Sequence, residues 1–139
     1  MFKMTNKNLL ERIEKAKLNA KGSNCLGTAL YLIGVRNIDE HVTYSEFPSY
    51  IAQLTKVTTI PEVGDLMAFG DKNGYFHAGI MLDPTKRVIC HRRGVGQGVF
   101  EDLIENLGDI MGGIPNSPFY RQAYSKPDFF RLKLNGRRK

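Results

Sequence analysis

The spacing of hydrophobic residues changes partway along this chain, and no other sequence feature constrains the fold as strongly. Up to about residue 33 they recur every three or four positions, which is the period of an amphipathic helix. Beyond residue 65 they occur in short runs separated by turn residues, which is typical of strands. Helices followed by an antiparallel sheet predict an α+β fold. The chain has no internal repeat, low-complexity segment or linker, so residues 1–139 are predicted to form a single domain.

Three helices are predicted in the first half of the chain. The first has apolar residues at positions 9, 10, 13 and 16, behind two residues that can cap a helix. The second runs from about Cys25 to Ile33, because the polar Gly22-Ser23-Asn24 segment can cap its start and Gly34 can end it. A shorter third helix is expected within residues 47–54, with Pro48 in its first turn.

The second half is predicted to be mostly strands and turns. The expected strands are Asp65–Phe69, His77–Leu82, Arg87–His91 and Asp128–Leu134. Between the last two, a short helix is expected at Asp102–Leu107. The segment Gly108–Pro118 is rich in Gly and Pro and is expected to be a loop.

The chain is basic, with 20 Lys and Arg against 14 Asp and Glu, and part of this excess lies in residues 131–139. A basic end is usually a solvated segment, and it can also draw a protein towards cell wall, nucleic acid or a membrane surface. No nucleic-acid motif accompanies it, so no specific nucleic-acid partner is expected. No apolar run approaches the roughly 18 residues of a membrane span. Residues 1–20 lack the apolar core of a signal peptide, which predicts a cytoplasmic protein or export by a signal-independent route.

Cys25 is the most informative position for chemistry. It is expected at the start of an apolar helix, where the helix dipole favours a thiolate. Beside a cationic partner such a cysteine can titrate at roughly 3.5–7.5 instead of about 8.5. Gly27, two residues later, leaves the main chain near the thiol open to a substrate. The alternative is a buried structural cysteine; these features together favour a nucleophile.

His77 and His91 lie on two predicted strands that flank the turn Asp83-Pro84-Thr85. A hairpin loop of three or five residues centred on Pro84 places the two histidines directly opposite on one face, with Cβ atoms roughly 4.5–5.5 Å apart. A loop of two or four residues would place them on opposite faces. Each histidine by itself can equally be a structural residue. Taken with Cys25, the pair indicates a general base and the residue that orients it.

Cys90 precedes His91 on the same predicted strand, so its side chain is expected on the opposite face, as a small core residue. A zinc site formed by Cys25, His77, Cys90 and His91 would need Cys90 to be turned round. We therefore predict neither a metal nor a cofactor. Asp65 is expected to be a turn residue and not a catalyst.

Four short motifs resemble the NlpC/P60 family of papain-like cysteine peptidases. They are Asn24-Cys25-Leu26-Gly27 opening a helix, Val63-Gly64-Asp65-Leu66, His77-Ala78-Gly79-Ile80, and a histidine that ends the next strand. The resemblance spans about Ser23 to His91, with Asp128–Leu134 as the closing strand. It implies a papain-like NlpC/P60 fold in which Cys25 is the nucleophile, His77 its base and His91 the orienting residue.

The family usually cleaves peptide or amide bonds in bacterial cell-wall peptides, needs no metal, and has relatives that act as lipid acyltransferases. Two positions depart from its common pattern: Asn24 stands in place of an aspartate and Leu26 in place of a serine. No tyrosine precedes Cys25, although one often helps to form the family's site. The Cys25 backbone N–H is expected to be one oxyanion donor, without a second donor identified.

The main functional hypothesis is a cysteine peptidase or amidase that acts on peptide or amide substrates, peptidoglycan fragments in particular, through an acyl-enzyme. The alternative from another class is a non-catalytic basic domain that binds an anionic partner through its tail and the loop Arg92–Gly98. A thiol acyltransferase of the same fold also stays open. Those relatives often place the histidine before the cysteine, which this chain does not. The sequence specifies no oligomeric state.

Overall fold

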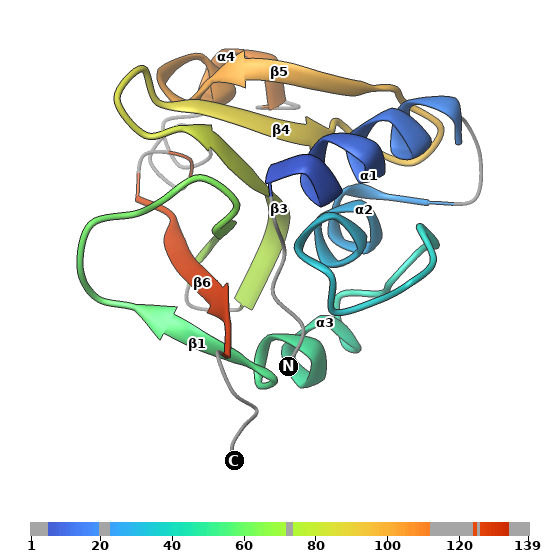
Figure 1. Ribbon diagram of the computed structural model, residues 1–139, viewed down its shortest axis with the longest axis horizontal. Coiled ribbons are helices and arrows are strands. Elements are labelled where there is room, and N and C mark those ends of the chain that lie inside the picture. The colour runs from blue at the N-terminus through green and yellow to red at the C-terminus, as the bar shows by residue number, and fades with distance from the viewer. Residues whose placement is uncertain (1–5, 20–22, 72–73, 112–123, 125, 134–139) are drawn as a thin grey trace.

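The computed structural model describes residues 6–19, 23–71, 74–111, 124 and 126–133. Helices and an antiparallel sheet occur together in this part of the chain, which confirms the α+β class. The helices are α1 (Asn6–Leu18), α2 (Cys25–Ile33), α3 (Phe47–Ile51), the short 3₁₀ helix η1 (Ile104–Asn106) and α4 (Leu107–Met111). The strands are β1 (Leu54–Val57), β2 (Leu66–Asp71), β3 (Gly74–Asp83), β4 (Val88–Arg92), β5 (Val99–Leu103) and β6 (Asp128–Leu132) (Figure 1).

The strands form one six-stranded sheet in the order β1-β6-β2-β3-β4-β5, and each neighbouring pair is antiparallel. The last described strand, β6, lies between β1 and β2, and Figure 1 shows it beside β1. Leu66 of β2 pairs with Phe130, and Leu54 of β1 pairs with Leu132. The end of the described chain therefore joins β1 to the rest of the sheet.

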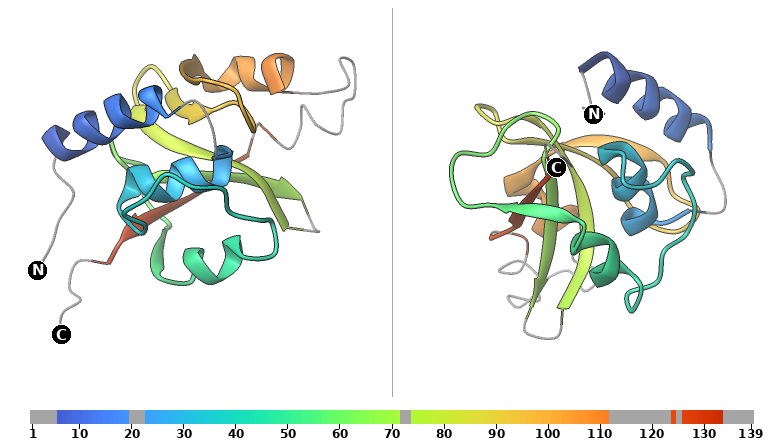
Figure 2. Two further views of the ribbon diagram at one scale, coloured as in Figure 1. Left: turned by 90° about the vertical axis from the view of Figure 1, so that its right-hand side faces the viewer. Right: turned by 60° about the horizontal axis from the view of Figure 1, so that its bottom comes forward.

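The two faces of the sheet pack against different helices. Ala68, Ala78 and Ile80 belong to the larger core, which includes buried residues of α1, α2 and α3. Met67 and Met81 point to the other face and pack in a second cluster with residues of η1 and α4. This division follows from the alternation of side chains along a strand. Figure 2 shows α1 and α2 on one side of the sheet and α4 on the other.

Most predicted elements are confirmed, and two segments are corrected. The helix expected within residues 47–54 ends at Ile51, and Leu54 instead begins strand β1. The second correction is the segment after β4. Residues 102–107 were expected to form a helix, yet Val99–Leu103 is strand β5, and helical structure begins only at Ile104. Pairing with β4 decides this, because each β5 residue from Val99 to Leu103 has a partner there. The expected loop Gly108–Pro118 is also wrong in part, since α4 extends to Met111; residues 112–118 lie outside the described residues.

The bounds of helix α2 match the prediction, because the sequence signals for its start and its end are both clear. Asn24 caps it by accepting a hydrogen bond from the Gly27 backbone N–H, and Gly34 ends it in the left-handed conformation at φ 95°. All nine residues of the helix are buried. The space beside Gly27, expected to be open to a substrate, is instead filled by the main chain of Glu40: a Cβ added to Gly27 would lie 1.8 Å from the Glu40 carbonyl oxygen.

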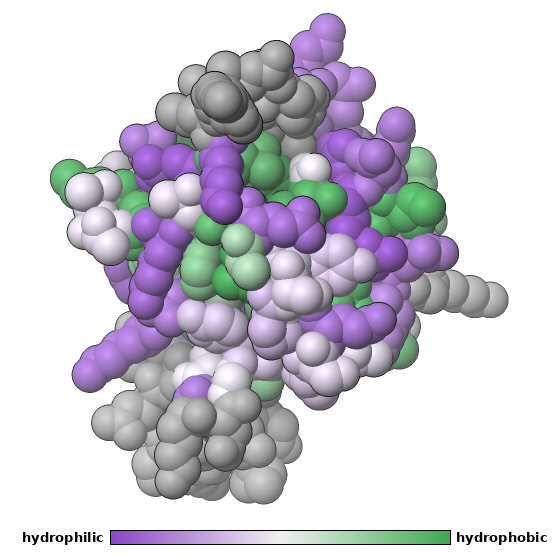
Figure 3. All heavy atoms as spheres, turned by 90° about the horizontal axis from the view of Figure 1, so that it is seen from below, coloured by the Kyte–Doolittle hydropathy of each residue, from purple (hydrophilic) through white to green (hydrophobic). Residues whose placement is uncertain are grey.

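The surface mixes polar and apolar residues. In the face seen in Figure 3, small hydrophobic areas are separated by hydrophilic side chains. No helix within the described ranges is long and apolar enough to cross a membrane.

Replacing Gly27 by Ala tests the contact between α2 and the segment that follows it. Alanine normally stabilises a helix interior relative to glycine, but here its methyl group overlaps main-chain atoms. We expect Gly27→Ala to lower the free energy of unfolding by roughly 1–3 kcal/mol, measured by urea denaturation. Gly94→Ala is the matched control: its Cβ would meet only the Gln97 side chain, at 3.6 Å. It should change stability by no more than about 0.5 kcal/mol. Equal stability of the two variants would contradict the close approach.

Candidate active site

The side chain of Asn24 holds the start of α2 against the loop that precedes α3. Its Oδ1 accepts hydrogen bonds from the Gly27 N–H at 2.9 Å and the Val42 N–H at 3.1 Å, and its Nδ2 donates to the Val42 carbonyl at 2.8 Å. An aspartate here would have no donor for that carbonyl. The asparagine at this position therefore has a structural reason: only the amide serves both groups of Val42.

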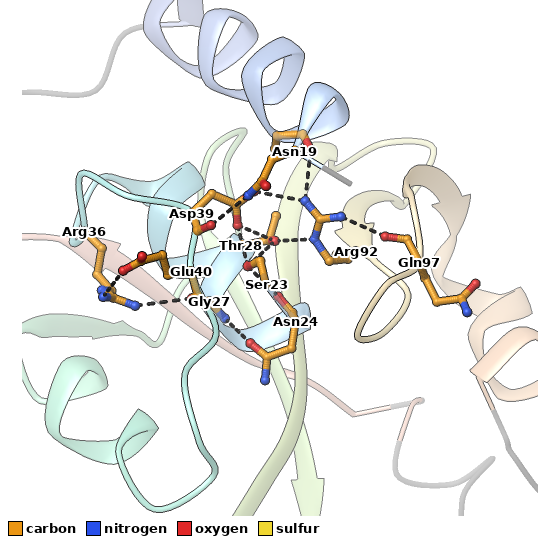
Figure 4. A network of polar contacts seen from close by, with 11 residues as sticks. Asn19, Ser23, Asn24, Gly27, Thr28, Arg36, Asp39, Glu40, Arg92 and Gln97 are labelled. Atoms are coloured by element: carbon orange, nitrogen blue, oxygen red, sulfur yellow. Dashed lines mark hydrogen bonds and ion pairs between the residues drawn. The ribbon is translucent and has the colours of Figure 1, made fainter. Parts of the chain in front are cut away.

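A buried arginine links the elements around this helix. Arg92, 1% exposed, donates to Thr28 Oγ1 at 2.8 Å, the Ala16 carbonyl at 2.9 Å and the Gln97 carbonyl at 2.7 Å, and forms an ion pair with Asp39 at 2.9 Å (Figure 4). Its charge is thus compensated inside the protein. Arg92, at the start of the loop Arg92–Gly98, therefore does not present its guanidinium at the surface.

His77 of β3 and His91 of β4 lie in direct contact. His77 Nε2 and His91 Nδ1 are 2.7 Å apart, and the rings meet edge to face at an interplanar angle of 87°. Each histidine is 1% exposed. The predicted contact between the two histidines is confirmed.

The register that produces this contact differs from the predicted one by two residues. Ile80 pairs with Cys90, so the hairpin is not centred on Pro84, and His77 does not lie directly opposite His91. A shift of two residues leaves every side chain on its original face, whereas a shift of one would reverse it. The two histidines consequently share a face as diagonal neighbours, a separation that ring side chains can bridge.

Asp102 continues the chain of contacts, and the sequence analysis did not identify it. Its Oδ2 lies 2.7 Å from His91 Nε2. Arg93 holds the same carboxylate through Nε at 3.3 Å and Nη2 at 3.0 Å, and stacks on the ring of Phe100. Strand β5 provides this position, since Asp102 pairs with Ile89, two residues before His91. The available signal was the β-branched and aromatic pair Val99-Phe100, which indicates a strand.

The Cys25 thiol faces the main chain of β3. Its sulfur donates a hydrogen bond to the Phe76 carbonyl at 3.7 Å. Phe76 is the extra residue of a β-bulge, because Phe69 pairs with His77 while Gly70 pairs with Tyr75. Within the described ranges, no hydrogen bond joins Cys25 to His77. The expected separation of about 3–4 Å between the sulfur and a ring nitrogen of His77 stays a prediction.

Cys25 and His77 line one cleft of about 530 Å³. Besides the start of α2 and strand β3, the lining comes from the loop before α3, the loop between β4 and β5, and Tyr124. None of the described lining residues is acidic. These residues are Asn24, Cys25, His41, Val42, Thr43, Tyr44, Phe76, His77, Arg93, Gly94, Val95 and Tyr124. The cleft is large enough for part of a peptide.

Burial keeps the thiol and both imidazoles uncharged. It raises the pKa of Cys25 to about 11, against the opposing effect of nearby backbone N–H groups that include that of Ala78. Burial also holds the pKa of His77 well below its usual value, and the adjacent His91 lowers it further. The pKa of His91 is lowered by burial, although Asp102 opposes the change. The stabilisation of a thiolate expected at the helix start is thus outweighed by desolvation.

The remaining sequence expectations concern Cys90 and Asp65. Cys90 is fully buried in the core beside α2, as expected. Asp65 accepts a hydrogen bond from the Glu62 N–H, as a turn residue does, and also binds the guanidinium of Arg131 at 2.7 and 2.8 Å. Among the described residues, no group of three or more His, Cys, Asp or Glu side chains could hold a metal ion.

Comparison with known proteins finds no match to a family model, to a curated protein or to a solved structure. The resemblance to NlpC/P60 peptidases thus rests on the motif residues of the sequence.

The buried histidines should make stability depend on pH. Below the unfolded-state histidine pKa of about 6.5, the unfolded chain binds protons that the folded protein excludes, so stability is full above that value and falls below it. The expected slope is roughly 1.4 kcal/mol per pH unit for each excluded proton. Urea denaturation over a pH series should show that the free energy of unfolding changes less with pH in His77→Gln than in the wild type. The exposed His41 is the control, and His41→Gln should keep the full slope. An unchanged slope in His77→Gln would contradict a neutral buried His77.

Proposed function

We propose that this protein is a cysteine hydrolase of peptide or amide bonds with a papain-like NlpC/P60 fold. Cys25 is the nucleophile, His77 the general base and His91 the residue that orients it. The main support is the 2.7 Å contact between His77 and His91 beside a cleft that is also lined by Cys25 at the start of α2. Nucleophile, base and orienting group are the parts that such a reaction requires.

The mechanism starts from a neutral thiol and a neutral imidazole. His77 Nε2 is engaged by His91, which leaves Nδ1 as the nitrogen that can accept the thiol proton. The Cys25 side chain turns from the Phe76 carbonyl towards this nitrogen as its sulfur attacks the substrate carbonyl. The protonated His77 then gives the proton to the leaving amine, and water releases the acyl group from the sulfur. The Cys25 backbone N–H is the proposed oxyanion donor.

The cleft supports a substrate that is neutral or anionic near the scissile bond. Its described walls carry the basic side chains His41 and Arg93 and no carboxylate. Tyr44 and Val95, both strongly exposed, line the cleft and offer apolar contact to a bound chain. Peptide segments of peptidoglycan, which carry carboxylates and small apolar side chains, are the substrate class we propose.

The contacts of two basic residues argue against the non-catalytic basic domain. Arg92 is buried with Asp39, and Arg131, which belongs to the basic tail, is engaged by Asp65.

A thiol acyltransferase would use the same acyl-enzyme and differ only in the acceptor.

Digestion of purified peptidoglycan fragments, followed by mass spectrometry, tests the proposal. The wild-type protein should release a new amine on a stem peptide, which also identifies the bond cleaved. Cys25→Ala should reduce turnover to background because it removes the nucleophile, and it should change stability by no more than about 1 kcal/mol. Cleavage of the sugar chain, or full turnover by Cys25→Ala, would show that the proposed mechanism is wrong.

The two histidines should differ in their effect on turnover. His77→Ala removes the group that moves the proton, whereas His91→Ala removes only its support. We expect a loss in kcat/KM of roughly 10²–10⁴-fold for His77→Ala and a smaller loss for His91→Ala. The opposite order would mean that the two roles are exchanged.

The raised pKa of Cys25 predicts how fast iodoacetamide alkylates it. Only the thiolate reacts, so the rate should rise about tenfold per pH unit from neutral pH towards the pKa of about 11. Peptide mapping by mass spectrometry separates Cys25 from Cys90, and Cys90→Ser provides a protein in which Cys25 is the single cysteine. Rapid alkylation that has already levelled off near neutral pH would show that Cys25 is a thiolate in the free protein.

A further inference from the structure

A continuous chain of contacts links Arg93 to His77 through side chains of β5, β4 and β3. Arg93 binds Asp102, Asp102 Oδ2 lies 2.7 Å from His91 Nε2, and His91 Nδ1 lies 2.7 Å from His77 Nε2. Partial burial alone would raise the pKa of Asp102, but hydrogen bonds from Arg93 and His91 lower it overall. Asp102 is therefore a carboxylate at neutral pH.

The chemistry of these groups assigns every proton along the chain of contacts. A carboxylate only accepts hydrogen bonds, so the proton between Asp102 and His91 belongs to His91 Nε2. A neutral imidazole carries a single N–H, so His91 Nδ1 has a lone pair and accepts. The proton between the histidines then belongs to His77 Nε2, and His77 Nδ1 carries none.

We propose that Asp102 is a positioning residue that acts through His91 and determines which nitrogen of His77 is the base. The catalytic consequence rests on the proposed function, whereas the assignment of protons does not. When His77 Nδ1 accepts a proton, its Nε2–H stays directed at His91, whose other nitrogen stays bound to the carboxylate. The positive charge on His77 is thereby stabilised without a change of partners.

Arg93 determines how an asparagine at position 102 would be oriented towards His91. A guanidinium has donors only, so it requires an acceptor from residue 102. In Asp102→Asn the amide oxygen would serve Arg93, and the amide N–H₂ would point at His91 Nε2. His91 would then carry its proton on Nδ1, and His77 would be forced to carry its proton on Nδ1 as well. The substitution should therefore move the protons on both histidines.

The test is nitrogen-15 NMR of histidine-labelled protein near neutral pH, combined with steady-state kinetics. In the wild type, His77 and His91 should each show a protonated Nε2 and an unprotonated Nδ1. Asp102→Asn should shift both histidines towards the Nδ1–H form and lower kcat by roughly 10²–10⁴-fold, with KM changed less than about threefold. Asp102→Glu retains the carboxylate and should restore the wild-type NMR pattern and part of the activity.

Glu101→Gln is the matched control. It removes the same charge from the adjacent residue, which pairs with Cys90 and so points to the other face of the sheet. This variant should keep the wild-type nitrogen signals and kcat.

Three results would overturn the inference: an Nδ1–H form of His77 in the wild type, unchanged histidine signals in Asp102→Asn, or an equal shift in Glu101→Gln. If Asp102→Asn does not fold, the wild-type and Asp102→Glu signals decide the proton assignment. Correct signals without turnover on any peptide substrate would contradict the proposed function and uphold the assignment.

Discussion

The buried guanidinium of Arg92 is the interaction on which the arrangement around the cleft depends. A cation that is 1% exposed is tolerated only where ion pairing and hydrogen bonds replace its hydration. Arg92 obtains them from α1, α2, the segment before α3 and the loop after β4. Asp39, its ionic partner, also accepts hydrogen bonds from Ser23 and Thr28 at the start of α2. Two elements that form the walls of the cleft are thus tied to the helix that carries Cys25.

Burial also determines the protonation states of Cys25 and His77 in the candidate site. Cys25 lies at a helix start, which favours an anion, but removal from water favours the neutral thiol more strongly. His77 is neutral for the same reason. In the proposed mechanism the ion pair therefore forms only as the sulfur attacks, and the hydrogen bonds that stabilise it are already in place before the substrate binds. Such preorganisation reduces the reorganisation needed in the transition state.

Local signals explain why much of the fold could be predicted. Helix α2 has a polar cap, an uninterrupted apolar body and a glycine where the left-handed conformation is needed, all within eleven residues from Asn24 to Gly34. The strands that carry His77 and His91 are bounded by turn residues. The shared face of the histidines could be predicted as well, because it depends only on whether the register shift is even or odd. Strand β5 could not be recognised in this way: its residues 100–103 are all partly or largely exposed, so hydrophobic alternation is weak.

The sequence by itself determined the α+β class, the place of Cys25 at a helix start, and the common face of His77 and His91. Each of these follows from interactions between residues near one another in the chain, or from the two-residue period of a strand. The tertiary structure decided that Asp102 contacts His91, that Arg92 is enclosed with Asp39, and that the Cys25 thiol is neutral. These features depend on strand order, register and depth of burial, which are set by packing between segments that are distant in the sequence.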